Sequence, residues 1–176
     1  MKKIIQKITV ATFFFCGFTI ASCSKEQGMS NMTVKMTDAP GDFQQVNVEV
    51  LEVQVHHGDE GWISLPTNQG IYDLLTLQND ITAVIVGPNQ LPAGRIDQFR
   101  LVLGSANTVM VDSLVYPLAT PSAQQSGLKI KVNSDFLPNE TYQLLIDFDA
   151  GQSIVEHGNG SYSLKPVIKL ESIITL

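Results

Sequence analysis

Apolar residues alternate with polar ones along much of this chain, and this period of two constrains the fold more than any other feature. Val46, Val48 and Val50 alternate with polar residues, and the alternation resumes one residue out of phase at Leu51. A slip of one residue would turn the apolar side chains to the other face, so a β-bulge at Val50-Leu51 is the simplest repair. The alternation recurs in segments 99–103, 128–132 and 142–148. Each is typical of a half-buried β-strand.

Turn residues separate these strands at close intervals. The segment 57–61 (HGDEG) predicts a reversal after the long strand. Asn159-Gly160 predicts a hairpin between the strands at 153–155 and 162–164. Pro92-Ala93-Gly94 predicts a turn that feeds the next strand, and Asp73 or Asp80 can start a short helical turn. No long segment has a 3.6-residue apolar stripe. The sequence therefore predicts an all-β fold, a two-sheet antiparallel β-sandwich of the prealbumin-like or immunoglobulin-like kind.

The N-terminal segment has the layout of an exported lipoprotein. Residues 1–22 combine a basic start with an apolar run that is too short to cross a bilayer comfortably. Ile20-Ala21-Ser22-Cys23 resembles the lipobox, in which cleavage before cysteine is followed by acylation of the thiol. We therefore expect a signal peptide at 1–22, a lipidated Cys23 with a flexible tether to residue 31, and one β-sandwich domain at 32–176. The alternative is an ordinary secretory signal with a chance cysteine.

This layout predicts where the protein is found and which partners it lacks. Ser24 after the cysteine is compatible with sorting to the outer membrane, so we expect a lipid-anchored protein of the bacterial cell envelope. Cys16 leaves with the leader and Cys23 carries lipid, so no disulfide forms and the core alone holds the fold. Removal of the leader, which has three lysines and no acid, changes the net charge from −6 to −9. That charge argues against a nucleic-acid partner.

Three aspartates form the first candidate site. Asp147 and Asp149 flank Phe148, so an inward Phe148 places both carboxylates on the opposite face, about 7 Å apart. With Asp38, they can bind Ca²⁺ or act as an acid and base pair. The simpler interpretation is that Asp38 and Asp149 cap their own turns. No other cofactor is expected.

The histidines are a weaker candidate for a metal site. His56 and His57 are adjacent on a strand and face opposite ways, and His157 lies in a distant hairpin. A zinc site needs three or four converging ligands. We expect these histidines to be exposed turn residues.

Two aromatic residues and one serine complete the candidates. Trp62 and Tyr72 lie near turns, where a ring can stack on a sugar or on a partner protein. Core filling is the more frequent role of a lone tryptophan in a sandwich, and we favour it for Trp62. Asp112-Ser113-Leu114 resembles an O-glycosylation acceptor triplet, which makes Ser113 a candidate glycosylation site. The alternative is that Ser113 is only a turn residue.

Several motifs in a fixed order resemble a known family. They include TDAPGDFQQVNVEV, LPAGRIDQFRLVLG, PSAQQSGLKI and DFDAGQSIVEHGNGSYSLKPVI. Together they are similar to the bacterial lipoprotein module called domain of unknown function 4382, over about residues 34–170. The resemblance implies no activity and no catalytic residues. The segment 91–101 is also similar to the strand entry of prealbumin-like sandwiches, which commonly bind carbohydrate or protein or act as spacers. That is an analogy of fold alone.

The sequence has no Gly-x-Ser-x-Gly elbow, P-loop, paired-cysteine metal site or His-Glu-x-x-His motif. We therefore expect a non-catalytic envelope module that binds a glycan or a protein. The first alternative is a structural spacer subunit of an envelope assembly. The second is a hydrolase that uses Asp38, Asp147 and Asp149, which requires these carboxylates to converge in a cleft.

Overall fold

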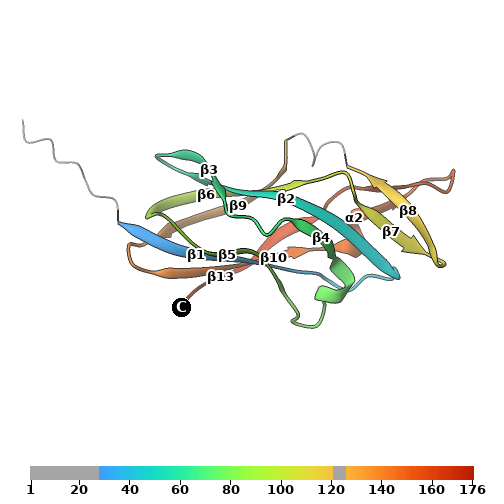
Figure 1. The fold of residues 1–176 in the computed structure, drawn as a ribbon, viewed down its shortest axis with the longest axis horizontal. Helices are drawn as coiled ribbons and strands as arrows, with labels where there is room; N and C mark the ends of the chain where they lie inside the picture. Colours follow the sequence, from blue (N-terminus) through green and yellow to red (C-terminus); the bar gives the residue numbers. More distant parts are fainter. Residues whose placement is uncertain (1–27, 121–125) are drawn as a thin grey trace, which may run out of the picture.

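The computed structural model describes residues 28–120 and 126–176, and these form two β-sheets packed face to face (Figure 1). The smaller sheet has four strands in the order β13–β10–β1–β5. Their bounds are Ile168–Thr175 for β13, Thr141–Phe148 for β10, Met29–Thr37 for β1 and Ala83–Pro92 for β5. The predicted signal peptide and Cys23 lie outside the described residues.

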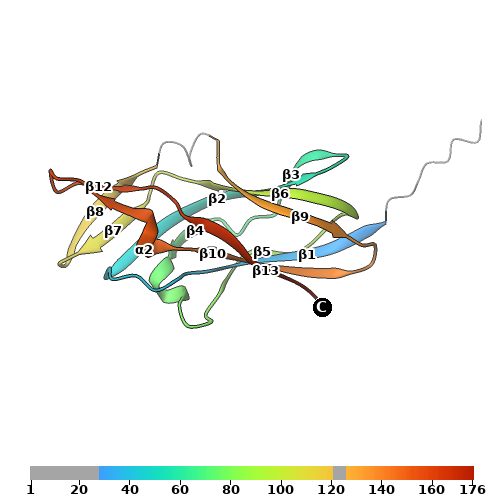
Figure 2. The same ribbon diagram turned by 180° about the vertical axis from the view of Figure 1, so that it is seen from behind.

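The larger sheet has nine strands and is built around the long strand β2 (Gln45–His57). Its main path runs β11–β12–β8–β7–β2–β6–β9, and β3 and β4 also pair with β2. The remaining bounds are Gly61–Leu65 (β3), Gly70–Asp73 (β4), Gly94–Leu103 (β6), Thr108–Val111 (β7), Leu114–Ala119 (β8), Leu128–Phe136 (β9), Ile154–Glu156 (β11) and Tyr162–Leu164 (β12). Figure 2 shows β12 and β8 at the end of the molecule opposite β3.

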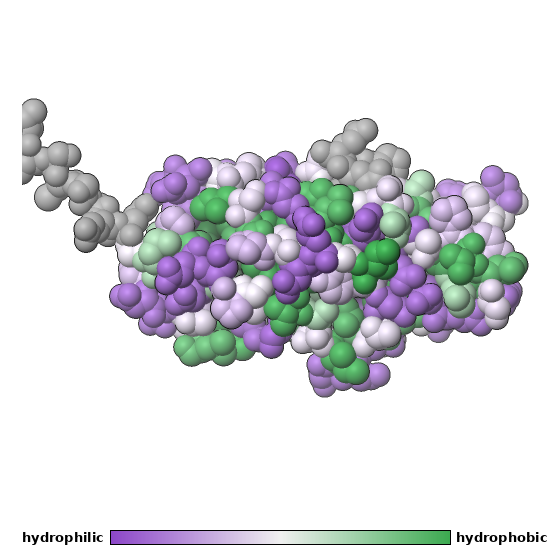
Figure 3. Space-filling model, in the orientation of Figure 1, coloured by the Kyte–Doolittle hydropathy of each residue, from purple (hydrophilic) through white to green (hydrophobic). Residues whose placement is uncertain are grey.

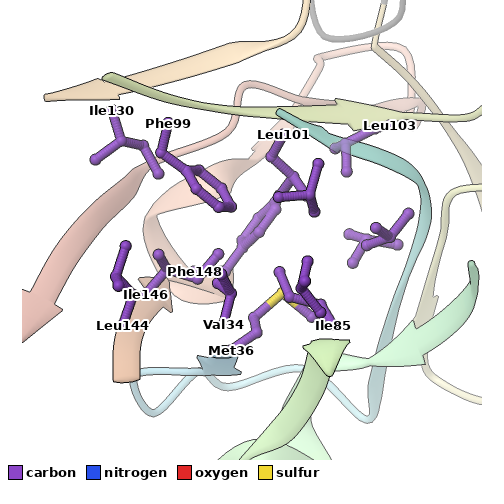
Figure 4. Packing of buried hydrophobic residues seen from close by; sticks show 14 of the residues in the cluster. Val34, Met36, Ile85, Phe99, Leu101, Leu103, Ile130, Leu144, Ile146 and Phe148 are labelled. Carbon is purple, nitrogen blue, oxygen red and sulfur yellow. The ribbon is translucent and has the colours of Figure 1, made fainter. Parts of the chain in front are cut away.

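The core lies between the two sheets and follows the alternation in the sequence. Side chains of β1 and β10 point up from the smaller sheet and meet those of β6 and β9 (Figure 4). Buried residues of β2 belong to the same cluster. Phe99 and Phe148 are both fully buried. Burial of one such ring stabilises the fold by about 1.5–3 kcal/mol. The all-β sandwich that the sequence predicts is confirmed.

Several local predictions are confirmed in the same strands. The register of β2 against β6 shifts between Val50 and Glu52, which is the predicted bulge, and Leu51 is exposed there. The predicted hairpins join β2 to β3 and β11 to β12. Of the two aspartates proposed to start a helical turn, Asp73 caps the 3₁₀-helix η1 (Leu74–Leu77). Asp80 instead occupies a left-handed turn with φ 67°.

Two features differ from a purely antiparallel sandwich with a tether to residue 31. β1 pairs with β10 in parallel, and β12 pairs with β8 in parallel. β1 also begins at Met29, where the polar segment 29–31 forms backbone pairs with both β5 and β10. The segment looked like a linker because its composition is polar, but main-chain hydrogen bonds do not depend on side-chain polarity.

The surface in Figure 3 has small groups of apolar residues interspersed among polar ones. Isolated exposed apolar residues of this kind are normal for a folded domain. Across residues 28–120 and 126–176, no helix has the length and apolar character needed to span a bilayer.

Candidate functional site

The outer face of the larger sheet carries an organised group of polar and aromatic residues at the end of the molecule that contains β3. One row of register partners crosses β3, β2, β6 and β9 and consists, in that order, of Ser64, Gln54, Arg100 and Lys129. A second row lies two residues further along each of these strands and consists of Trp62, His56, Gln98 and Lys131. Residues paired across strands share a face. We name six of these residues the Trp62 patch: Trp62, His56, Gln54, Arg100, Lys129 and Lys131.

Trp62 is held in place within this patch by two of its neighbours. The guanidinium carbon of Arg100 lies 3.6 Å from the centroid of the indole ring, and the His56 ring meets it edge-on at 5.1 Å. Arg100 is itself fixed, because its Nη1 donates a hydrogen bond of 2.9 Å to Gln54 Oε1. A cation stacked on an indole ring contributes about 0.5–2 kcal/mol. The ring is therefore positioned before any ligand arrives.

Trp62 does not fill the core, so the favoured core placement was wrong. It is half-buried on the outer face and is not part of the cluster between the sheets. Tyr72, in contrast, pairs with the inward-facing Val48 and packs against that cluster, while its hydroxyl donates to Asn68 O. Burial raises the pKa of Tyr72. The structure therefore does not bring Trp62 and Tyr72 together, because they lie on opposite faces.

Asp38 lies in a second region, and it connects three segments of the chain. Only 5% of Asp38 is exposed; its Oδ1 accepts from Ala150 N at 2.8 Å and its Oδ2 from Gln78 Nε2 at 3.2 Å. The prediction that Asp38 caps its own turn was therefore wrong. Burial raises the pKa of Asp38 to about 6, although both hydrogen bonds act against the shift and the charges of Asp147 and Asp149 add to it.

The other two aspartates have different surroundings. Asp149 caps the helical turn α2 (Ala150–Ser153) by accepting from Gln152 N, which confirms the capping interpretation for this residue. Asp147 faces outward beside Asp38 in an open pocket of about 340 Å³, and its Oδ2 pairs with Lys169 Nζ at 3.3 Å. The Oδ1 atom of Asp147 is buried and has no hydrogen-bond partner among the described residues. Asp38 and Asp147 thus converge, whereas Asp149 is turned toward its own helix.

No group of three or more His, Cys, Asp or Glu suited to a metal ion is present in the part of the chain that the structure describes. The histidines also do not converge. His57 is fully buried, which corrects the expectation that it is an exposed turn residue, and His56 is half-buried beside Asp97 Oδ2 at 3.3 Å. His157 is exposed, with its Nε2 3.0 Å from Ser163 Oγ.

Ser113 lies in the tight turn between β7 and β8. Asp112 and Ser113 have φ values of 49° and 65°, and Ser113 N donates to Gln44 Oε1 at 2.7 Å. The turn assignment is confirmed. The Ser113 side chain is exposed, and its glycosylation stays a prediction.

Sequence reasoning missed the cationic half of the Trp62 patch. Arg100, Lys129 and Lys131 alternate with buried residues, so the period of two already indicates that they face outward. Their proximity to Trp62 depends on strand order, because β3 and β9 are separated by β2 and β6. The alternation predicts the face of each side chain but not its neighbours.

The comparisons with known proteins give a family and no activity. A family model described as Domain of unknown function (DUF4382) matches residues 29–166, from the first residue of β1 to the loop before β13. No match was found among curated proteins or among solved structures. Since the matched segment covers most of the chain and both sheets, this protein belongs to the DUF4382 family.

Proposed function

We propose that this protein is a lipid-anchored module of the bacterial cell envelope that binds carbohydrate without catalysis, through the Trp62 patch. The observation that carries the proposal is the place of Trp62 on an outer sheet face, fixed by Arg100 and His56. A pre-positioned indole ring can stack on a sugar without losing much conformational entropy when the ligand binds. A spacer has no need of such an arrangement.

The non-catalytic reading also has support from the aspartates. Asp38 and Asp147 meet the requirement that a hydrolase places its carboxylates in one pocket. However, both oxygens of Asp38 accept hydrogen bonds from the protein, which connects β1 to α2 and to the loop after η1. A general acid must be within reach of the substrate atom that it protonates. The arrangement of Asp38 favours a structural role.

The binding proposal predicts that Trp62→Ala weakens glycan binding by tenfold or more, a loss of about 1.4 kcal/mol. Glycan-array screening of the soluble domain identifies ligands, and titration calorimetry then compares the variants. Tyr72→Phe is the matched control, since Tyr72 packs against the core from the other face, and it is expected to leave affinity unchanged. Equal affinity of Trp62→Ala and the unchanged protein for every ligand found would contradict the proposal. Retained melting behaviour shows that Trp62→Ala is folded.

The anchor proposal predicts complete loss of acylation in Cys23→Ser. Cells grown with an alkyne-labelled fatty acid should label the unchanged protein, which then sediments with the outer-membrane fraction. Multiple acyl chains hold a protein firmly, because each buried CH₂ contributes about 0.8 kcal/mol. The Cys23→Ser protein should carry no label and be released into the soluble fraction. A label that persists in this variant argues for an ordinary secretory signal instead.

A further inference from the structure

Positive charge in this acidic protein is concentrated on two neighbouring strands. The described residues contain seven lysines and arginines, and four of them, Arg95, Arg100, Lys129 and Lys131, lie on β6 and β9. Three of these four belong to the Trp62 patch. The chain as a whole has a net charge of −6. The patch therefore has the opposite sign to the protein that carries it.

Two cations of the patch, Lys129 and Lys131, have no acidic partner among the described residues, in contrast to Arg95 and Lys169. Arg95 pairs with Asp97 at 3.1 Å, and Lys169 pairs with Glu171 at 2.9 Å. Lys129 and Lys131 are exposed and form no ion pair with any residue that the structure describes. Their charge remains available to a ligand.

Arg100 adds a more specific observation. Its Nη1 donates a hydrogen bond to the neutral amide oxygen of Gln54. Its Nε is buried and has no hydrogen-bond partner among the described residues. A buried donor of a charged group without an acceptor is costly, and an acceptor from a ligand, an ion or an ordered water can satisfy it. Glu52, at the margin of the patch, forms no hydrogen bond with Arg100, because its carboxylate accepts from Ser64 Oγ and Gln54 Nε2. These two hydrogen bonds lower the pKa of Glu52, and the charge of Arg100 adds to the effect.

The positions of the cations suit a repeating anionic ligand. Lys129 and Lys131 are two residues apart on one face of β9, about 7 Å along the strand, and Arg100 is the register partner of Lys129 about 5 Å away across the sheet. The ring of Trp62 lies beside this row, with Lys129 Nζ 5.9 Å from its centroid. Carboxylates at intervals along a polymer can contact the cations while one sugar ring stacks on the indole.

We propose that the ligand of the Trp62 patch is an acidic polysaccharide, a polymer of uronic acids, and this inference rests on the carbohydrate-binding function proposed above. Charge complementarity selects the acid groups, and the aromatic ring selects the sugar. A lipid surface fits the patch less well, because none of the exposed large apolar side chains belongs to the patch. An acidic peptide supplies the charge but no sugar ring.

The experiment compares polymers that differ only in charge. The soluble domain is titrated with polygalacturonate, alginate and hyaluronate, and with the carboxyl-reduced form of each. We expect at least one acidic polymer to bind about tenfold more tightly than its reduced form, and this difference to shrink as NaCl is raised from 50 to 300 mM. Lys129→Gln/Lys131→Gln should abolish the difference, while Lys35→Gln/Lys165→Gln, with the same change in net charge at sites on β1 and after β12, should preserve it.

The possible failures are distinguishable. If the reduced polymers bind as tightly as the acidic ones and Lys129→Gln/Lys131→Gln changes nothing, the acidic ligand is overturned and the carbohydrate-binding function survives. If neither form of any polymer binds, the acidic ligand is overturned, and the glycan array then decides the binding function alone. Equal affinity for polyglutamate or for vesicles of anionic phospholipid would also overturn the inference, because neither offers a sugar to Trp62.

Discussion

Gly94→Ala is expected to lower the free energy of unfolding by about 3 kcal/mol. Gly94 has φ 146°, which side chains rarely adopt, and an added Cβ would lie 2.7 Å from His57 Nε2. Backbone strain of this kind costs about 1–3 kcal/mol, and overpacking of a buried site costs a similar amount. Chemical denaturation of the soluble domain, followed by circular dichroism, measures the loss.

The position of Gly94 explains why the site cannot relax. The chain passes there from β5 in the smaller sheet to β6 in the larger one, and His57 is fully buried beside the turn. The His57 ring is held between Asp59 N, 3.3 Å from Nδ1, and Ala93 O, 3.4 Å from Nε2. With Nδ1 accepting from the Asp59 amide, Nε2 carries the proton and donates to Ala93 O. Burial and these two contacts therefore oppose movement of the ring away from an added methyl group.

A double-mutant cycle separates the two costs of Gly94→Ala. In the His57→Ala background the clash is removed and only the backbone strain remains, so Gly94→Ala should cost about 1–2 kcal/mol less there. Gly158→Ala is the control, since an added Cβ at Gly158 meets nothing within 4 Å, and its effect should stay within about 0.5 kcal/mol. Equal costs of Gly94→Ala in both backgrounds would remove His57 from the explanation.

The strands and several turns could be predicted because their signals are local. The alternation in β2, its slip at Val50-Leu51 and the Asn159-Gly160 hairpin each depend on residues within one segment. The same local rule places His57 inward, two residues after Val55, although the sequence interpretation assigned it to an exposed turn. The glycine and acidic residues that follow indicated a turn, but the strand continues through His57 before the chain reverses.

The surroundings of Asp38 could not be predicted, because they depend on parallel pairing. β1 and β10 are more than 100 residues apart in sequence, and their parallel register places Thr37 opposite Asp147. Asp38 therefore lies beside Ala150, and its Oδ1 accepts a hydrogen bond from the Ala150 amide, which is 112 residues away in the sequence. From the sequence alone, convergence of the aspartates is a requirement of the hydrolase alternative and not a prediction. The hydrogen bonds that Asp38 accepts follow from strand order.

The Trp62 patch depends partly on local sequence pattern and partly on strand order. The register of the hairpin pairs Trp62 with His56, and His56 alternates with buried residues, so an outward Trp62 follows from local pattern once the turn is placed. The neighbours Arg100 and Lys129 require the order β3–β2–β6–β9, which comes from pairings distant in sequence. One aromatic residue could thus be found from the sequence, but its cationic partners could not.

We expect Asp38 to contribute about 2 kcal/mol more to the stability of the fold in mild acid than at neutral pH. Burial raises the pKa of Asp38 from 3.8 to about 6 in the folded protein. Between these two values the folded state retains a proton that the unfolded chain has lost, so the contribution to stability falls as pH rises through 6. Below 3.8 both states are protonated, and above 6 the ionised carboxylate keeps the full cost of its burial.

Asp38→Asn isolates this contribution because it removes the charge and keeps the hydrogen bonds. The Asn oxygen can accept from Ala150 N, and the Gln78 amide can turn so that its oxygen accepts from the Asn side chain. Relative to the unchanged protein, Asp38→Asn should gain about 2 kcal/mol between pH 4 and pH 7.5, or about 5 °C in Tm. Asp135→Asn removes a charge of the same sign from an exposed position and should show a much smaller change.

The outcome also bears on what the pocket beside Asp38 can do. A buried carboxylate that only connects β1 to α2 should be replaceable by an amide with a gain in stability and no loss of glycan affinity, because the Trp62 patch lies on the outer face of the other sheet. A pH-independent difference between Asp38→Asn and the unchanged protein would mean that Asp38 is hydrated or paired in solution. Loss of binding in a stable Asp38→Asn protein would place the ligand at this pocket instead of at Trp62. The stability profile and the affinity of one variant therefore test the structural role of Asp38 and the location of the binding site together.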